Sequence, residues 1–317
     1  LLSDDDDIVD GRKKVERTIP ATALICSFPR LSTLHPQHAA TLLHELGHSL
    51  HSLVSKTQYQ HLSGTRGPVD FVEFPSHLFE FYASDPGCME HYMGADLQTA
   101  STRKLFQTAL ANFRQSRGQF AHVEAAQQLL FAVLDQQFYA CPAGSTAAEV
   151  HRRLDAGIAR SFPALSKSVQ LLSSGGKNGA SSGDPRARLV SETSSGAPFT
   201  NNPYDGTHTN NSLRNVLSPM PLSRFEHLVH YGGEYYCYLL NKVVSAHVWR
   251  HGKFAQFNEQ SGARLLQLLA KGSVAPTFGE INALLPAGAP PAALKYETGC
   301  SEGWEVSLDA YVDELKG

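Results

Sequence analysis

The stretch PQHAATLLHELGHSLHSLV, residues 36–54, decides how the rest of the chain is interpreted. Apolar residues recur along it at three- and four-residue steps, which is the spacing of one face of an α-helix. Pro36 suits the first turn of such a helix, because the N–H group that proline lacks would have no intrahelical partner there. The pattern predicts a helix that begins near Pro36 and carries this apolar series: Ala40, Leu43, Leu46, Leu50 and Leu53 or Val54.

Two histidines, His44 and His48, lie four residues apart on this helix. Residues with that spacing share one helical face, so both imidazoles can point at a single ion. Neutral imidazole is a good zinc ligand, and a catalytic zinc site typically has three protein ligands and a fourth position for water. Glu45, which follows His44, is placed to take a proton from that water as it attacks a carbonyl group. The pattern therefore predicts one catalytic zinc ion.

A third ligand is required, and Glu73 in DFVEFPS (residues 70–76) is the best candidate by position. A carboxylate among apolar side chains at the entry to the next helix would be costly to bury unless a cation accompanied it. Glu80 and Asp70 are candidates to accept a hydrogen bond from a ligand histidine and so fix its tautomer. His51 extends the histidine face, but three histidines of one helix fit a tetrahedral ion poorly. We therefore expect His51 to support the site or to pack beside it.

These residues also have simpler interpretations. His44 and His48 could be surface or core histidines, although two histidines inside an apolar helix need partners, which a metal would provide. Glu73 could be a glutamate favoured at a helix start by the helix dipole. Asp70 and Glu80 could have purely solvent-facing or structural roles. The residues alone leave these alternatives open.

The rest of the chain has a mostly α-helical pattern. Helices are expected near residues 75–82, 94–139 with a break near Arg117-Gly118, 146–160, 222–230, 234–250, 254–270 and 306–315. The β-branched segment Thr18–Phe28 could form an edge strand, and residues 58–70 have the glycines and proline of a loop. The expected fold class is thus mostly α, with at most a small edge sheet.

Composition changes sharply after Leu172. Residues 173–215 are dense in Ser, Gly, Asn, Thr and Pro, which predicts a flexible surface insertion. Helical patterns resume immediately afterwards. We therefore expect a zinc-binding region over residues 1–172, the insertion over 173–215, and a helical part of the same catalytic domain over 216–317.

Charge and cysteine content exclude several classes of protein. Lys and Arg total 27 against 30 Asp and Glu, and no concentrated basic surface is visible, so nucleic acid is not an expected partner. No apolar run approaches the roughly 18–20 residues of a membrane span. The five cysteines form no CxxC pair, which argues against a cysteine zinc site or a disulfide scaffold and favours a reducing compartment.

Three stretches carry a resemblance to a known family. HELGHSLH (residues 44–51), YQHLSGTRGPVDFVEFPSHLFEFYASD (59–85) and FEHLVHYGGEYYCY (225–238) occur in that order. Together they resemble the active-site region and the substrate-side loop of the thimet oligopeptidase family of zinc metallopeptidases, and in particular its mitochondrial branch. The similarity covers about residues 42–86 and 225–249.

The resemblance implies a multi-helical zincin-type fold with His44, His48 and Glu73 as ligands of one zinc ion. It also implies that Glu45 is the general base. Family members are longer than this chain, with a large helical N-terminal part that forms the other wall of a channel. We therefore expect these 317 residues to be a catalytic portion.

The resemblance also implies roles for the second motif. His227, Tyr231 and Tyr238 would face the substrate and donate hydrogen bonds to a developing oxyanion, an effect often worth a few kcal/mol per donor. Tyr235 and the pair Gly232-Gly233 would belong to a mobile substrate-binding loop. Without the resemblance, the three tyrosines would be interpreted as helix packing.

Three functions follow as hypotheses. The first is a zinc metalloendopeptidase that processes precursor intermediates in the mitochondrial matrix and acts as a monomer on peptide or precursor-protein substrates. The second is a general oligopeptidase for short peptides, with a cytoplasmic location as the alternative. The third, from another class, is a non-catalytic helical scaffold with a zinc site, which the presence of Glu45 disfavours.

Overall fold

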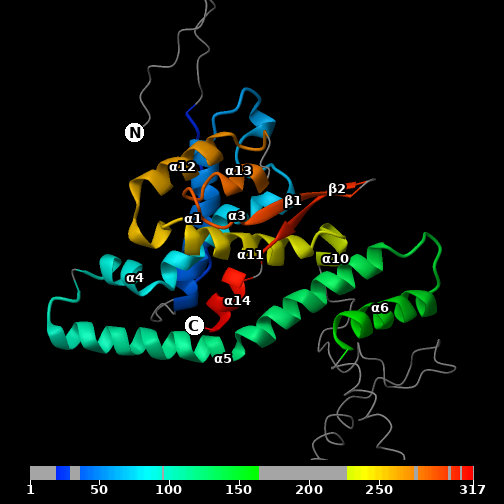
Figure 1. Ribbon diagram of the computed structural model, residues 1–317, viewed down its shortest axis with the longest axis horizontal. Coiled ribbons are helices and arrows are strands. Elements are labelled where there is room, and N and C mark those ends of the chain that lie inside the picture. The colour runs from blue at the N-terminus through cyan, green and yellow to red at the C-terminus, as the bar shows by residue number, and fades with distance from the viewer. Residues whose placement is uncertain are drawn as a thin grey trace, which may run out of the picture. The chain divides into compact units, whose positions relative to one another are not determined.

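The computed structural model describes residues 19–28, 36–94, 96–163, 227–274, 278–298, 301–307 and 309–316. Within them the chain is mostly helical and has one small sheet (Figure 1), so the predicted fold class is confirmed. The predicted insertion at residues 173–215 lies outside the described residues. In the described part of the chain, no helix combines the length and the apolar character that a membrane crossing requires.

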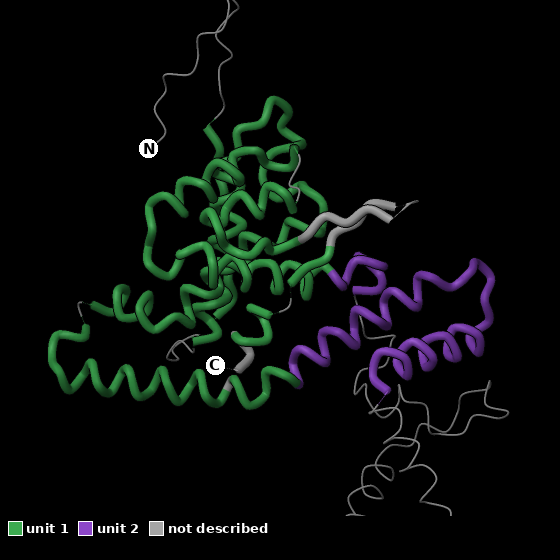
Figure 2. Tube along the Cα trace, viewed as in Figure 1, with its two compact units in different colours: residues 1–122, 237–317 green, residues 123–236 purple. Residues whose placement is uncertain are grey.

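The chain divides into two compact units (Figure 2). Unit 1 is made of residues 1–122 and 237–317, and unit 2 of residues 123–236. Unit 2 is thus one continuous segment of the sequence, which separates the two parts of unit 1 along the chain. The expected division of the chain at residues 172 and 215 stays a prediction.

Unit 1 contains most of the elements. Its helices and 3-10 turns are α1 (Pro36–Val54), η2 (Gln60–Leu62), α2 (Val69–Val72), α3 (Phe74–Glu80), η3 (Phe81–Ala83), α4 (Pro86–Tyr92), the first part of α5 (Ala100–Tyr139), α11 (Tyr236–His251), η5 (Phe254–Gln256), α12 (Glu259–Ala270), α13 (Phe278–Asn282) and α14 (Asp309–Lys316). Its strands β1 (Ala293–Thr298) and β2 (Ser301–Val306) pair antiparallel, with Ala293 opposite Val306.

Unit 2 contains the second part of α5, α6 (Ala147–Ser161) and the short α10 (His227–His230). The N-cap residue of α6 is Thr146, whose hydroxyl and backbone form a capping box with Glu149. The two long helices bury a small apolar core between them: Leu130, Leu134, Leu154 and Ile158.

Helices α1 and α3 approach each other unusually closely at Gly47. A Cβ atom at this position would lie 2.8 Å from Ser76 Cα and 2.9 Å from the Pro75 carbonyl oxygen. Side chains normally keep helix axes 8–10 Å apart, so only glycine lets the backbone of α3 come this near. The buried face of α1 is accordingly centred on Gly47 and His51, whereas Leu46, expected on the apolar face, is 42% exposed.

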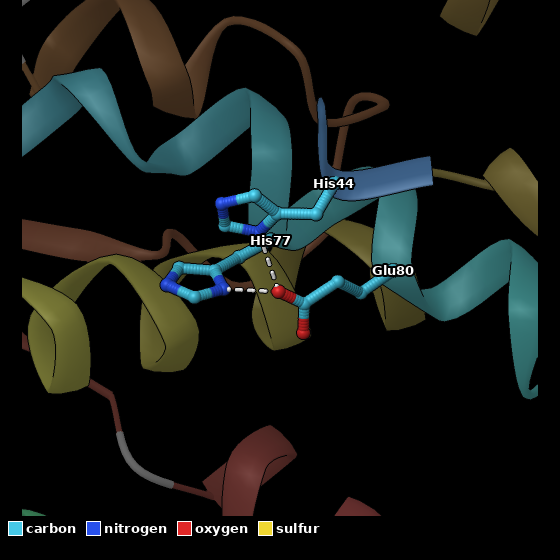
Figure 3. Close-up of side chains that lie close together, drawn as sticks. All are labelled: His44, His77 and Glu80. Carbon is cyan, nitrogen blue, oxygen red and sulfur yellow. Dashed lines mark hydrogen bonds and ion pairs between the residues drawn. The ribbon is translucent and has the colours of Figure 1, made fainter. Parts of the chain in front are cut away.

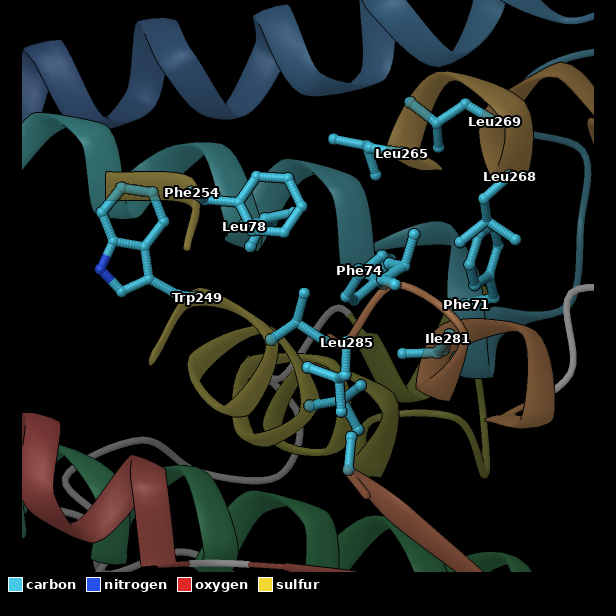
Figure 4. Close-up of a cluster of buried hydrophobic side chains, with 14 of the residues drawn as sticks. Phe71, Phe74, Leu78, Trp249, Phe254, Leu265, Leu268, Leu269, Ile281 and Leu285 are labelled. Atoms are coloured by element: carbon cyan, nitrogen blue, oxygen red, sulfur yellow. The ribbon is translucent and has the colours of Figure 1, made fainter. Parts of the chain in front are cut away.

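The core of unit 1 lies between α3, α11 and α12 (Figure 4), and α11 also fixes the turn between α2 and α3. Asn241 Nδ2 donates a hydrogen bond to the Val69 carbonyl oxygen at 2.9 Å. Ser245 Oγ donates to the Phe74 carbonyl oxygen, also at 2.9 Å. Both side chains are buried. The backbone on either side of Glu73 is therefore held by a helix that lies more than 160 residues further along the chain.

Two expected elements were wrong. The segment expected as an edge strand forms no strand over residues 19–28, and Ile19 and Ile25 are 88% and 87% exposed, because no neighbouring strand covers them within the described residues. The expected break near Gly118 does not occur, since α5 runs unbroken for 40 residues. One glycine costs only about 1 kcal/mol in a helix, which is too little to interrupt a long one.

The C-terminal part differs from the prediction in detail. The helix expected over residues 254–270 is divided into η5 and α12 by Phe257, which has a left-handed φ of 48°. The helix expected from residue 306 begins at Asp309, and the preceding residues form strand β2, which the sequence patterns did not indicate.

Replacing Gly47 by alanine should destabilise the protein. Forcing a methyl group between two helix backbones typically costs about 1–3 kcal/mol, which outweighs the helix propensity gain of about 1 kcal/mol. We expect a lower melting temperature for Gly47→Ala by calorimetry. Gly262→Ala in α12 is the matched control, because no atom lies within 4 Å of its Cβ position. That variant should be as stable as the wild type or more stable. A Gly47→Ala protein with undiminished stability would contradict the close approach.

Candidate metal centre

His44 and His48 of α1 direct their Nε2 atoms at the carboxylate of Glu73. The distances to Glu73 Oε2 are 3.4 Å from His44 and 3.2 Å from His48. The three side chains are 17–23% exposed, so the cluster lies at the surface of the core and is reachable from solvent. The three residues proposed as ligands thus come together, and their donor atoms all lie within 4.8 Å of one another.

This donor set fits a zinc ion. Zinc binds imidazole nitrogen and carboxylate oxygen at about 2.0–2.2 Å, so two ligand atoms of a tetrahedral site lie about 3.4 Å apart. The two nitrogen–oxygen distances of the cluster match that separation. Two histidines with one glutamate are also a known ligand set of catalytic zinc.

The turn between α2 and α3 places Glu73. Pro75 stands at the start of α3, and Ser76 Oγ donates hydrogen bonds to Glu73 Oε2 at 2.8 Å and to the Glu73 carbonyl oxygen at 2.9 Å. The neighbouring Phe71 and Phe74 are buried in the core. The carboxylate is therefore held toward α1 by a rigid turn.

The second ring nitrogen of His44 contacts a different carboxylate. Glu80 Oε1 lies 2.7 Å from His44 Nδ1 and 2.9 Å from His77 Nδ1 (Figure 3). Both distances are shorter than the separation of two zinc ligands, so these three residues form a hydrogen-bonded group rather than a second metal site. A proton on Nδ1 leaves the Nε2 lone pair of His44 free to bind an ion.

The charges of the cluster favour a cation. Burial alone would lower the pKa of His44, but its hydrogen bonds with Glu73 and Glu80 outweigh this effect and raise the pKa to about 9. Burial would raise the pKa of Glu73 and Glu80, yet their histidine partners hold both well below the usual range. Burial lowers the pKa of His77. Two ionised carboxylates thus face His44 from both sides.

Unit 1 also contains four other residues that were expected at the site. Glu45 is half-buried and forms no ion pair within the described residues. Asp70 lies in α2 and belongs to neither group of clustered ligand atoms in the described chain. His51 is buried with its ring edge-on to Phe71, and burial lowers its pKa to about 4, so it is uncharged near neutral pH. Tyr238 is half-buried in α11.

The remaining expected residues belong to unit 2. His227 lies in α10, with the rings of Tyr231 and Tyr235 packed against it at centroid distances of 5.5 and 4.8 Å. Gly233 has a left-handed φ of 83°, and a Cβ atom at Gly232 would overlap the ring of Tyr139. These positions require glycine for local geometry, independently of the loop mobility that was expected. Their role toward the metal cluster stays a prediction.

Three contact residues were missed by the sequence reasoning. Ser76 and His77 each lie three positions from the glutamate that they contact, so helical spacing could have indicated them. Asp135, which is buried and accepts hydrogen bonds from the backbone of Gly233 and Tyr235, lies 98 and 100 residues away from them. No local pattern could have revealed that contact.

Comparisons with known proteins agree with the predicted family. The chain is 29% identical over 251 residues to the mitochondrial intermediate peptidase of Arabidopsis thaliana, a match that covers 76% of this chain and 28% of that protein. It is 28% identical over 262 residues to the human mitochondrial intermediate peptidase, covering 80% of this chain and 29% of the human protein. With the Aspergillus niger protein it shares 34% identity over 145 residues, or 43% and 18% of the two chains.

The chain therefore spans less than a third of the length of these relatives. The model of Peptidase family M3 matches residues 5–164, which is half of the chain and includes the whole cluster of His44, His48 and Glu73. The family expected from the sequence is thereby confirmed, and this chain belongs to peptidase family M3.

Proposed function

We propose that this chain is the catalytic portion of a zinc-dependent metalloendopeptidase. The observation that carries the proposal is the convergence of His44 Nε2, His48 Nε2 and Glu73 Oε2 at the separation that tetrahedral zinc requires. These three atoms would hold the ion. When bound, zinc supplies Lewis acidity, which makes a water molecule acidic enough to react near neutral pH.

The chain's own residues prepare this site. Glu80 accepts a hydrogen bond from His44 Nδ1 and thereby orients the ring, so that Nε2 is the nitrogen that would bind the ion. His77 donates to the same carboxylate oxygen from the buried side. Ser76 fixes the Glu73 carboxylate in the same manner. Of the three proposed ligands, His44 and Glu73 are thus oriented by hydrogen bonds before any ion is bound.

Glu45 is the proposed general base. It follows His44 on α1 and has no competing ion pair in the described chain, so its carboxylate is available to accept a proton from the attacking water. The same carboxyl group then donates the proton to the leaving amine. Hydrolysis in this scheme needs no covalent intermediate.

The second motif supplies the proposed substrate contacts. His227, Tyr231 and Tyr238 would donate hydrogen bonds to the oxyanion that develops on the scissile carbonyl, and Tyr235 with Gly232 and Gly233 would shape the substrate-binding loop. Tyr231 is 58% exposed, which supports a role in contacting a ligand.

For the substrate class, we propose precursor intermediates of imported mitochondrial proteins. The names of the relatives, mitochondrial intermediate peptidases from a plant, a fungus and human, support this class and a mitochondrial location, for which we propose the matrix.

Replacing Glu73 by glutamine should abolish zinc binding. The wild type should hold about one zinc per chain and melt at a lower temperature after chelation, because a ligand at 1,000 times its dissociation constant stabilises the folded state by about 4 kcal/mol. Glu73→Gln should show little metal and no response to chelator in calorimetry. His61→Ala is the control, since this histidine is exposed in η2 and outside the cluster. Stoichiometric zinc in Glu73→Gln would exclude Glu73 as a ligand.

Replacing Glu45 by glutamine should separate metal binding from catalysis. The variant keeps all three proposed ligands, so we expect full zinc content by mass spectrometry. Loss of the general base should lower kcat by about 10²–10⁴-fold in a peptide cleavage assay. Glu124→Gln, at an exposed position of α5, should leave both values unchanged. Equal hydrolysis by Glu45→Gln and wild type would rule out the base role, and equal inertness of both would favour the zinc scaffold.

The substrate class can be tested by competition. We expect kcat/KM for a precursor intermediate to exceed that for unrelated short peptides by at least about tenfold, since extra contacts worth 1.4 kcal/mol give one factor of ten. Glu45→Gln serves as the blank in both assays. Equal rates for the two substrate types, or a cytosolic location of the tagged natural protein, would instead favour a general oligopeptidase.

A further inference from the structure

The backbone from His227 to Tyr235, here called the donor segment, is held by side chains of α5. The contacts come from Asp135, Gln136 and Tyr139, in the last two turns of that helix. All of these residues belong to unit 2. None of them was indicated by the sequence patterns.

Asp135 makes the central contact. Its side chain is fully buried, and its two carboxylate oxygens accept hydrogen bonds from the backbone N–H groups of Gly233 at 2.8 Å and of Tyr235 at 2.9 Å. A buried carboxylate is costly unless it is well hydrogen-bonded, and bonds to a charged acceptor are about twice as strong as neutral ones. Gly233 adopts a left-handed φ of 83°, which favours glycine. The carboxylate therefore holds a turn whose backbone conformation most other residues would not adopt.

Two neighbours on α5 hold the donor segment at further points. Gln136 Nε2 donates a hydrogen bond to the Gly233 carbonyl oxygen at 2.5 Å. The backbone N–H and carbonyl groups of Gly233 are therefore both hydrogen-bonded to side chains of α5. The Tyr139 hydroxyl donates to the Leu228 carbonyl oxygen, and its ring fills the space beside Gly232. The donor segment is therefore fastened near its start and near its end.

The aromatic rings of the donor segment contact one another and α5. The Tyr235 hydroxyl donates to Gln128 Oε1 at 2.9 Å, and its ring meets His227 edge-on at 4.8 Å. The ring of Tyr231 also packs against the ring of His227, with a centroid distance of 5.5 Å, and Tyr231 remains exposed. The Gly233 turn is thus linked through Tyr235 to His227, and from His227 to Tyr231, by rings that pack against one another.

We propose that Asp135 is a positioning residue for the peptidase reaction. It acts through the amides of Gly233 and Tyr235 to set where the donor segment presents His227 and Tyr231. The inference rests on the proposed function, in which those two side chains donate hydrogen bonds to the substrate. Asp135 itself does not contact the substrate in this scheme.

The test is Asp135→Asn in the zinc-loaded protein. Asparagine has one acceptor oxygen, so one of the two backbone bonds is lost and an amide N–H faces another N–H group. We expect hydrogen exchange at the Gly233 and Tyr235 amides to become at least tenfold faster. In peptide cleavage, kcat should fall at least tenfold while KM changes less than threefold, because transition-state contacts are lost and ground-state binding is kept.

Two further variants separate positioning from stability. Glu149→Ala removes the capping box of α6 in the same unit and should lower the melting temperature without changing kcat or exchange at Gly233. Gln136→Ala, at an exposed position, removes a neighbouring bond without burying a new polar group and should accelerate exchange at the same turn with a smaller loss of kcat. If Asp135→Asn does not fold, Gln136→Ala carries the test.

The outcomes are distinguishable. Unchanged amide exchange in Asp135→Asn and Gln136→Ala, or a fall in kcat that Glu149→Ala reproduces, would overturn the positioning role. A wild type that binds zinc but cleaves no peptide would overturn the proposed function instead, and exchange would still decide whether Asp135 holds the donor segment.

Discussion

The close contact between α1 and α3 at Gly47 is the constraint on which the candidate site depends. His44 and His48 come from one of these helices, and Glu73 directly precedes the other, whose last residue is Glu80. The two carboxylates reach opposite nitrogens of the His44 ring only because the helix backbones touch without an intervening side chain. A glycine in the middle of a helix normally weakens it, so its presence inside HELGH is explained by what it brings together rather than by the helix itself.

The carboxylates of the site are kept charged by their hydrogen-bond partners. Glu73 and Glu80 are held ionised by hydrogen bonds from histidines and Ser76, although burial opposes ionisation of both. The backbone around Glu73 is in turn fixed from α11 by Asn241 and Ser245. Each carboxylate therefore has a defined direction, which is what a metal ion of strict geometry needs from its ligands.

What could be predicted from the sequence follows the range of the interactions involved. The helix at residue 36, the shared face of His44 and His48, and the nearby carboxylates Glu73 and Glu80 are local in the chain, so spacing alone was informative. The family resemblance extended this to the donor segment. The contacts of Asp135, Asn241 and Ser245 join parts of the chain about 100 to 170 residues apart and leave no periodic trace.

The errors have similar causes. Thr18–Phe28 has strand-like composition, but a strand needs a partner, and composition does not reveal one. A helix break was predicted at Gly118, but the helical residues on both sides of it stabilise α5 by more than one glycine destabilises it. Strands β1 and β2 were missed because a short pair with polar residues has little alternation to detect.

The two parts of unit 1 are far apart in the sequence, which affects when their contacts can form during synthesis. Ser245 of α11 and the Phe74 carbonyl that it supports are 171 residues apart. At about 5–20 residues per second, ribosomes would complete the start of α3 roughly 10 to 30 seconds before Ser245 emerges. During that interval the nascent chain lacks the buried hydroxyl that later binds the Phe74 carbonyl oxygen.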